Sequence, residues 1–155
     1  MYTSEINEVL EAWTPYIEAI GDWQALVAGV EPKPTGCGPI YELPNPIDRP
    51  NESFAIADMT AVKVAEPHYH TNGETEIYIV LMGLGKIIIG GQESELKPGT
   101  VAVTPPETAH FTIPYENLVL AVINTPPFEA ANAVTLTGSD SNVGFDYEQF
   151  SRLTA

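Results

Sequence analysis

The sequence predicts an all-β domain, built as an antiparallel sandwich or barrel, with helices only near its ends. Over residues 53–126, short runs of β-branched and aromatic residues alternate with turns rich in glycine and proline. No stretch with helical periodicity separates these runs, which disfavours parallel sheets because they need crossover helices. The chain has 155 residues, 44 % of them hydrophobic, which suits one ordinary domain with a packed core. We therefore expect a single domain over residues 1–155 with a β core.

Residues 1–30 are expected to form a helical N-terminal segment. Thr14 and Pro15 resemble an N-cap followed by a first-turn proline, which predicts two short helices with a break between them. The segment also carries both tryptophans, Trp13 and Trp23. It is expected to pack on the body of the domain or, alternatively, to form a subunit interface. The helical prediction rests on an apolar stripe at helical spacing, made of Ile6, Val9, Leu10, Trp13, Ile17 and Ile20.

Residues 31–52 contain 6 of the 14 prolines in the chain. Prolines at this density disfavour both helices and paired strands, so an extended arm or covering loop is expected. Apolar residues such as Ile40 and Tyr41 would anchor this arm. Together with Trp13 and Trp23, they exceed what one barrel face needs to cover itself, and they predict a homodimer.

The barrel core is expected over residues 53–126, and its strands can be predicted in order. The Gly90-Gly91 pair predicts a hairpin with a two-residue loop, and residues 97–100 predict a turn. Beyond the core, residues 127–155 are expected to form a C-terminal loop and a helix over residues 146–153. The predicted strands cover residues 54–64, 76–82, 86–89, 92–96, 101–104, 111–113 and 118–123.

The charge of the chain excludes several classes of partner. Six Lys and Arg residues stand against 21 Asp and Glu residues, a formal net charge of −15. Such a chain is repelled by phosphate backbones and anionic lipids, so neither nucleic acid nor a membrane is an expected partner. The single cysteine, Cys37, cannot close an internal disulfide, and without a neighbouring base it is expected to be unreactive. These features, with no signal-peptide pattern at the N-terminus, predict a cytoplasmic protein.

All three histidines lie in the β-rich region. His68 and His70 are two residues apart, so on a strand both imidazoles point to one face. Glu76 opens the next strand with the same parity as Tyr78, and His110 lies on a later strand. Three imidazoles and one carboxylate suit one divalent transition metal ion, namely Fe, Mn, Ni, Zn or Cu, and are poor ligands for calcium or magnesium. The pattern therefore predicts a metal site.

Two separated motifs resemble those of the cupins, a family of small jelly-roll barrels. The resemblance covers about residues 53–128 and implies an antiparallel jelly-roll barrel with one metal ion inside it. Carried over to this sequence, the implied metal ligands are the three histidines and one glutamate. The motifs are His68-x-His70…Glu76-(x)6-Gly83 and Gly99-(x)5-Pro105…His110.

The glutamate of the first motif has two candidates. Glu74 fits the spacing from the histidines, whereas Glu76 fits the spacing to Gly83. We choose Glu76 as the ligand, because a strand would hold its side chain. Glu74 follows the turn pair at residues 72–73 and is expected to be mobile at the rim.

Cupins include dioxygenases, decarboxylases, isomerases and non-catalytic binding domains, so the resemblance leaves the function open. The leading hypothesis is a metal-dependent enzyme acting on a small oxygen-rich organic molecule, with Tyr78 and Glu74 as candidate proton carriers. The alternative is a non-catalytic cupin that binds a small-molecule ligand. The motifs also resemble archaeal-type phosphoglucose isomerases. Against that, Lys63, Lys86 and Lys97 are the only cations over residues 53–126, few for a dianionic phosphate.

Overall fold

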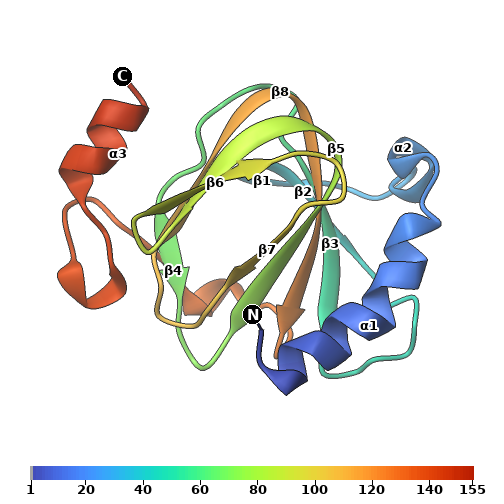
Figure 1. The fold of residues 1–155 in the computed structure, drawn as a ribbon. Helices are drawn as coiled ribbons and strands as arrows, with labels where there is room; N and C mark the ends of the chain where they lie inside the picture. Colours follow the sequence, from blue (N-terminus) through green and yellow to red (C-terminus); the bar gives the residue numbers. More distant parts are fainter. Residues whose placement is uncertain (1) are drawn as a thin grey trace.

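A computed structural model describes residues 2–155 as a nine-stranded antiparallel sheet that curls into a half-barrel, with helices at both ends (Figure 1). The predicted all-β class and antiparallel barrel architecture are thereby confirmed. The helices are α1 (Ser4–Glu18), α2 (Trp23–Leu26) and α3 (Tyr147–Leu153), with short 3-10 turns η1 (Ala130–Asn132) and η2 (Ser141–Val143). The strands are β1 (Lys33–Thr35), β2 (Gly38–Leu43), β3 (Ser53–Asp58), β4 (His68–His70), β5 (Thr75–Ile89), β6 (Gln92–Leu96), β7 (Val101–Thr104), β8 (His110–Thr125) and β9 (Ala133–Thr135).

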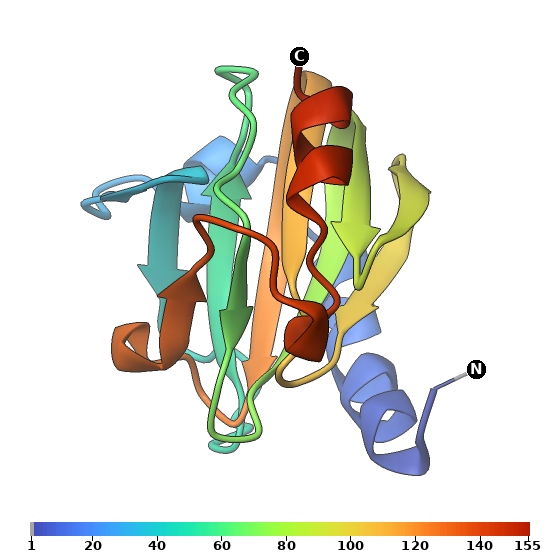
Figure 2. The ribbon, with the colours of Figure 1, turned by 90° about the vertical axis from the view of Figure 1, so that its left-hand side faces the viewer.

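The two long strands β5 and β8 pair along most of their length and form the spine of the sheet (Figure 2). Neighbouring strands along one path through the sheet follow the order β1-β2-β3-β8-β4-β9. Strand β5 lies off this path and pairs with β6 and β7 as well as with β8. Strands β3 and β4 both pair with the edge of β8 that is opposite β5, so β8 lies between β4 and β5 in the sheet.

Alternation along β5 decides which side chains face the interior of the half-barrel. Ile77 and Ile79 point outward and belong to the apolar cluster that includes the buried face of α1. Glu76 and Tyr78, at the intervening positions, point inward and line a cavity. The period of two therefore separates the residues that hold the fold together from those that form the candidate site.

The N-terminal segment forms one helix through Pro15, so the predicted break at this proline is wrong. Helix α1 runs to Glu18, and the chain breaks only between that residue and α2. An apolar face with Trp13 and Ile17 buried on either side of the proline spans the whole helix. Packing of this face against the sheet outweighs the backbone hydrogen bond that a proline removes.

Trp13 is fully buried within the chain. Its ring lies 5.2 Å from that of Phe54 on β3, and its indole N–H donates to Glu52. The segment therefore packs on the body of the domain, and Trp13 is not available to a second subunit. The homodimer stays a prediction.

The proline-rich arm pairs into the sheet as β1 and β2, contrary to the expectation of an extended arm or covering loop in which prolines disfavour strand pairing. Pro34 lies opposite Pro39, one step from the hairpin loop that Thr35 and Gly38 close. In a two-residue hairpin that step is a pair without ladder hydrogen bonds, so the missing N–H groups cost the β1–β2 ladder nothing. The arm becomes a wall of the half-barrel.

Two pairs of predicted strands merge in the structure. Residues 76–82 and 86–89 are parts of β5, and residues 111–113 and 118–123 are parts of β8. Register shifts between Val80 and Gly85 accommodate the irregular segments that separate the predicted strands in each pair. The Gly90-Gly91 hairpin and the turn before β7 are confirmed.

Gly83 lies at the centre of this irregularity, and Gly83→Ala should strongly destabilise the fold. Its φ is +83°, and an added Cβ would lie 2.2 Å from the backbone carbonyl of Asn117 on β8. Strain at positive φ alone costs roughly 1–3 kcal/mol, and the clash adds to it. Gly99→Ala is the matched control, because φ is +85° there and no atom lies within 4 Å. Urea denaturation should show the larger loss for Gly83→Ala, and equal losses would contradict this account.

The C-terminal helix is confirmed as α3, with Asp146 as its N-cap. Phe150 on this helix packs against Phe111 and Phe145 on the outer side of the barrel, away from α1. Among residues 2–155, no helix combines the length and the apolar character needed to span a bilayer.

Candidate metal centre

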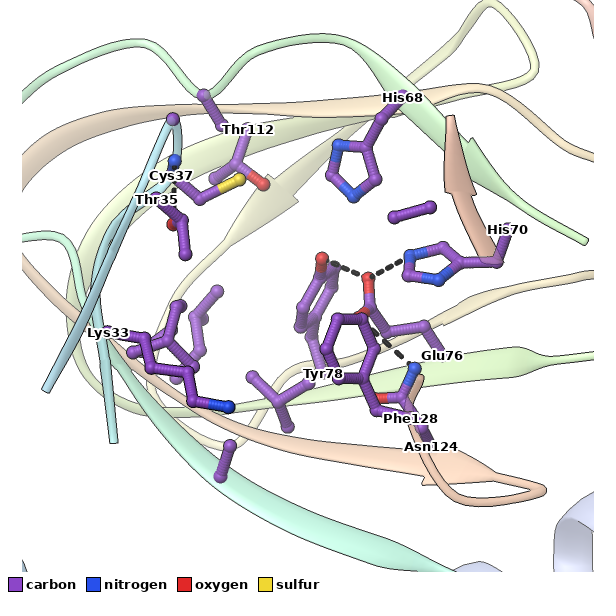
Figure 3. Close-up of a pocket in the computed structure, with 18 of the residues that line it drawn as sticks. Lys33, Thr35, Cys37, His68, His70, Glu76, Tyr78, Thr112, Asn124 and Phe128 are labelled. Carbon is purple, nitrogen blue, oxygen red and sulfur yellow. Dashed lines mark hydrogen bonds and ion pairs between the residues drawn. The ribbon is translucent and has the colours of Figure 1, made fainter. Parts of the chain in front are cut away.

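Four polar side chains converge inside the half-barrel. Three of them, His68, His70 and Glu76, are labelled in Figure 3. Strand β4 contributes His68 and His70, β5 contributes Glu76, and β8 contributes His110. One ligand atom from each residue lies within 4.8 Å of all the others. Pairing of β4 with β8 sets His68 directly opposite His110. The four residues that the sequence analysis selected as metal ligands are thus brought together.

Backbone carbonyl groups orient two of the imidazoles. His68 Nδ1 lies 2.9 Å from the carbonyl oxygen of Glu66, and His110 Nδ1 lies 3.2 Å from that of Thr108. A carbonyl oxygen only accepts hydrogen bonds, so each Nδ1 carries the proton and donates. The Nε2 lone pair of each neutral ring is then left free to bind a cation.

The third imidazole, His70, is oriented by Glu74. The carboxylate of Glu74 is fully buried and lies 3.0 Å from His70 Nδ1. It also accepts hydrogen bonds from Asn124, at 2.8 Å, and from Asn132, at 3.1 Å. The expectation that Glu74 is mobile at the rim is therefore wrong. The turn at residues 72–73 folds this side chain inward, where the two amide groups hold it.

The converging atoms of the cluster are acceptors that need a positive charge between them. Glu76 Oε1 lies 2.9 Å from His110 Nε2 and 3.5 Å from His70 Nε2. His70 Nε2 is buried and has no hydrogen-bond partner. A nitrogen lone pair and a carboxylate repel one another at such distances unless a proton or a metal cation lies between them. The cluster could therefore hold a metal ion, and its N₃O donor set suits a divalent transition metal.

The pKa values follow from this arrangement. Burial opposes the charge of Glu76, but the adjacent imidazoles of His110 and His70 outweigh it and hold the pKa of Glu76 well below its usual range. For His70, burial alone would lower the pKa, but the carboxylates of Glu76 and Glu74 outweigh burial and raise the pKa. Burial and the neighbouring His110 lower the pKa of His68 to about 4. His68 is thus a neutral imidazole at neutral pH, the form that binds metals.

Tyr78 points into the interior, as expected from its parity with Glu76. Its hydroxyl group donates a hydrogen bond to Glu76 Oε1. Burial, together with the negative charge of Glu76, raises the pKa of Tyr78 well above its usual range. The phenol therefore stays protonated and can act as a hydrogen-bond donor beside the cluster.

A cavity of about 520 Å³ extends from the cluster to the β1–β2 hairpin. Its walls are mainly apolar and include Ile40, Leu120 and Phe128. Lys33 is the sole cationic Lys or Arg among the described residues that line it, and its ammonium group lies 2.8 Å from the carboxylate of Glu42. The contribution of β1 and β2 to this wall was not predicted from the sequence, because the prolines of these residues indicated an unpaired arm.

Cys37 lines the same cavity, on the side away from His70 (Figure 3). Burial, with the charges of Glu76 and Glu66, raises the pKa of its thiol to about 12. The thiol is therefore protonated at neutral pH, which agrees with the expectation that Cys37 is unreactive.

Comparisons with known proteins identify the family. The sequence profile described as "Cupin domain" matches residues 58–116, which include all four residues of the cluster. L-ectoine synthase of Vibrio campbellii is 29 % identical over 84 residues, which are 52 % of this chain and 66 % of that protein. The chain thus matches slightly less than two thirds of the length of this relative.

Two solved structures share the fold. Streptomyces Pac13 in complex with uridine, a protein described as a nucleoside dehydratase, has a TM-score of 0.62 at 10 % identity, over 74 % of this chain and 91 % of its own. A protein from Planctomyces limnophilus has a TM-score of 0.59 at 25 % identity, over 69 % of this chain and 90 % of its own. The sequence match, the shared barrel and the two motifs agree: residues 58–116 of this chain belong to a cupin domain.

Proposed function

We propose that this cupin is a metal-dependent enzyme that acts on a small, oxygen-rich organic molecule. The observation that carries the proposal is the set of four convergent acceptors at the inner end of a largely apolar cavity. His68, His70, Glu76 and His110 would hold one divalent ion of Fe, Mn, Ni, Zn or Cu. Such an ion supplies a Lewis acid that polarises the oxygen atoms of a substrate.

The other residues of the cavity support a chemical role. Tyr78 keeps its proton, so it can donate a hydrogen bond or a proton to a substrate oxygen next to the cluster. The apolar walls exclude water and strengthen electrostatic interactions inside the cavity. The fit of a small ligand is further supported by the cavity volume, which lies within the usual range for ligand pockets.

The charges of the lining favour a neutral or cationic substrate. Glu42, Glu66 and Glu76 contribute carboxylates to the cavity, whereas Lys33 is its one ammonium group among the described residues and is already paired. A dianionic phosphate would be repelled by this lining. The observation weighs against a sugar-phosphate isomerase. The relationship to L-ectoine synthase supports an enzyme over a non-catalytic binding protein.

Tyr78→Phe is expected to lower turnover by roughly 100-fold or more while metal binding persists, because removal of a proton donor typically costs 10²–10⁴-fold. Compounds from a panel of small oxygenated molecules are first selected by thermal shift of the metal-loaded protein, and product formation is then followed by mass spectrometry. Tyr69→Phe is the matched control, since Tyr69 lies between the two histidines of β4 but packs on the outer face.

Two results would count against the proposal. Equal turnover by Tyr78→Phe and the parent would remove Tyr78 from the chemistry. A metal-loaded parent that binds compounds from the panel and converts none of them would instead favour the non-catalytic binding protein.

A further inference from the structure

Glu74 lies behind the cluster and not in the cavity. Its carboxylate is 0 % exposed, and the residue is absent from the described lining of the cavity. It nevertheless contacts the cluster, through His70 Nδ1 at 3.0 Å. A buried carboxylate that does not line the cavity cannot contact a substrate there, so any effect of Glu74 on the site passes through His70.

The partners of Glu74 determine the tautomer of His70. Asn124 and Asn132 each donate an amide N–H to Glu74, at 2.8 and 3.1 Å. An ionised carboxylate has acceptor sites for both amides and for a third donor, and no proton to give. His70 must therefore donate from Nδ1, and its buried, unpartnered Nε2 presents a lone pair to Glu76 and the rest of the cluster.

The two asparagines cannot easily turn away from Glu74. Asn132 Oδ1 accepts a hydrogen bond from Asn72 at 2.6 Å, which leaves its amide nitrogen facing Glu74. The backbone carbonyl of Asn132 also accepts from the N–H of Thr71 at 2.8 Å. Asn124 Nδ2 lies 3.4 Å from Glu76 Oε2 as well and so links the two carboxylates. The amide groups of Asn124 and Asn132 thus hold the carboxylate of Glu74 in one position.

We propose that Glu74 is a positioning residue that holds His70 in the Nδ1–H tautomer, with Nε2 directed at the metal site. The proposal rests on the proposed metal-binding function and assigns Glu74 no contact with substrate. It also assigns a role in the site to Asn132, because this residue orients Glu74. Carboxylates that orient metal-binding histidines typically change metal affinity by 10–100-fold when they are removed.

The first experiment compares Glu74→Ala with the parent and with Glu107→Gln. Glu107 is an exposed carboxylate that touches His70 only through its backbone N–H, which the substitution retains. Long-range ¹H–¹⁵N NMR of the metal-free proteins at alkaline pH reports the tautomer of each neutral imidazole. Competition with a chelator reports the affinity for Zn²⁺.

The parent and Glu107→Gln should show His70 as the Nδ1–H tautomer. In Glu74→Ala, His70 should populate the Nε2–H tautomer, which donates to Glu76, and Zn²⁺ affinity should fall about 10–100-fold. A folded Glu74→Ala with the parent tautomer and an affinity within about two-fold of the parent would overturn the proposal.

A compensating pair keeps the test valid if the alanine variant does not fold. In Glu74→Gln the new amide group would face the amide of Asn132, donor against donor. Adding Asn132→Asp restores an acceptor there, so the double variant should bind Zn²⁺ more tightly than Glu74→Gln alone. Equal or weaker Zn²⁺ binding by the double variant would contradict the claim that the hydrogen bond from Asn132 orients Glu74. A parent that binds no metal would reject the proposed function, while the tautomer of His70 in the metal-free proteins still decides the role of Glu74.

Discussion

His110→Ala is expected to remove most of the bound metal ion and the rise in Tm that the ion gives the parent protein. His110 supplies one of the three imidazole nitrogens of the cluster, and no other described histidine can replace it. A ligand that binds only the native state stabilises it by about 2.7 kcal/mol at 100 times its Kd. For a chain of this length, that corresponds to a rise in Tm of roughly 5–10 °C. The variant should show almost none of this rise.

Each variant must be compared with itself, with and without metal. His110 is buried, so alanine leaves a cavity that lowers the Tm of the metal-free protein as well. The matched control is Thr112→Ala, which removes a buried side chain two residues along β8 that lines the cavity but is not one of the four cluster residues. It should keep the metal-dependent rise. If His110→Ala also kept it, the assignment of His110 as a ligand would fail.

Glu76→Gln is expected to weaken metal binding by at least about 100-fold, while the shape of the site is preserved. Loss of a residue that merely orients a ligand costs 10–100-fold, and loss of the charged ligand itself should cost no less. The amide oxygen of glutamine can still accept the hydrogen bond from Tyr78, so the surrounding structure should persist. Chelator competition with Zn²⁺ and Mn²⁺ measures the affinity.

Glu52→Gln provides the control for removing a buried carboxylate. Glu52 pairs with Arg49 and accepts from Trp13, remote from the metal-ligand cluster. This variant should lose stability equally with and without metal and keep the metal affinity of the parent. An unchanged metal affinity in Glu76→Gln would show that the carboxylate of Glu76 is not a ligand, and it would reopen the choice between Glu74 and Glu76.

The interior face of the barrel could be predicted from the sequence because it depends on strand parity. Parity placed His68 with His70 and Glu76 with Tyr78, and the structure brings both pairs to one interior face. Local turn chemistry likewise predicted the Gly90-Gly91 hairpin. Such features depend on residues that are close together along the chain.

The features that were missed depend on contacts between distant residues. Glu74 is buried because Asn124 and Asn132, 50 and 58 residues away, donate hydrogen bonds to it. No local sequence pattern predicts these contacts. Helix α1 continues through Pro15 because Trp13 packs on Phe54, 41 residues further along. Tertiary packing overrode local propensity in both cases.

The central claim is that His68, His70, Glu76 and His110 bind one divalent transition metal ion. The most direct test is the metal content of the protein, purified without added metal or a metal-binding tag and measured by inductively coupled plasma mass spectrometry. The account predicts close to one transition metal ion per chain, or uptake of one when Fe²⁺, Mn²⁺, Ni²⁺, Zn²⁺ or Cu²⁺ is supplied at neutral pH. A protein that contains no transition metal and takes up none of these ions would contradict it.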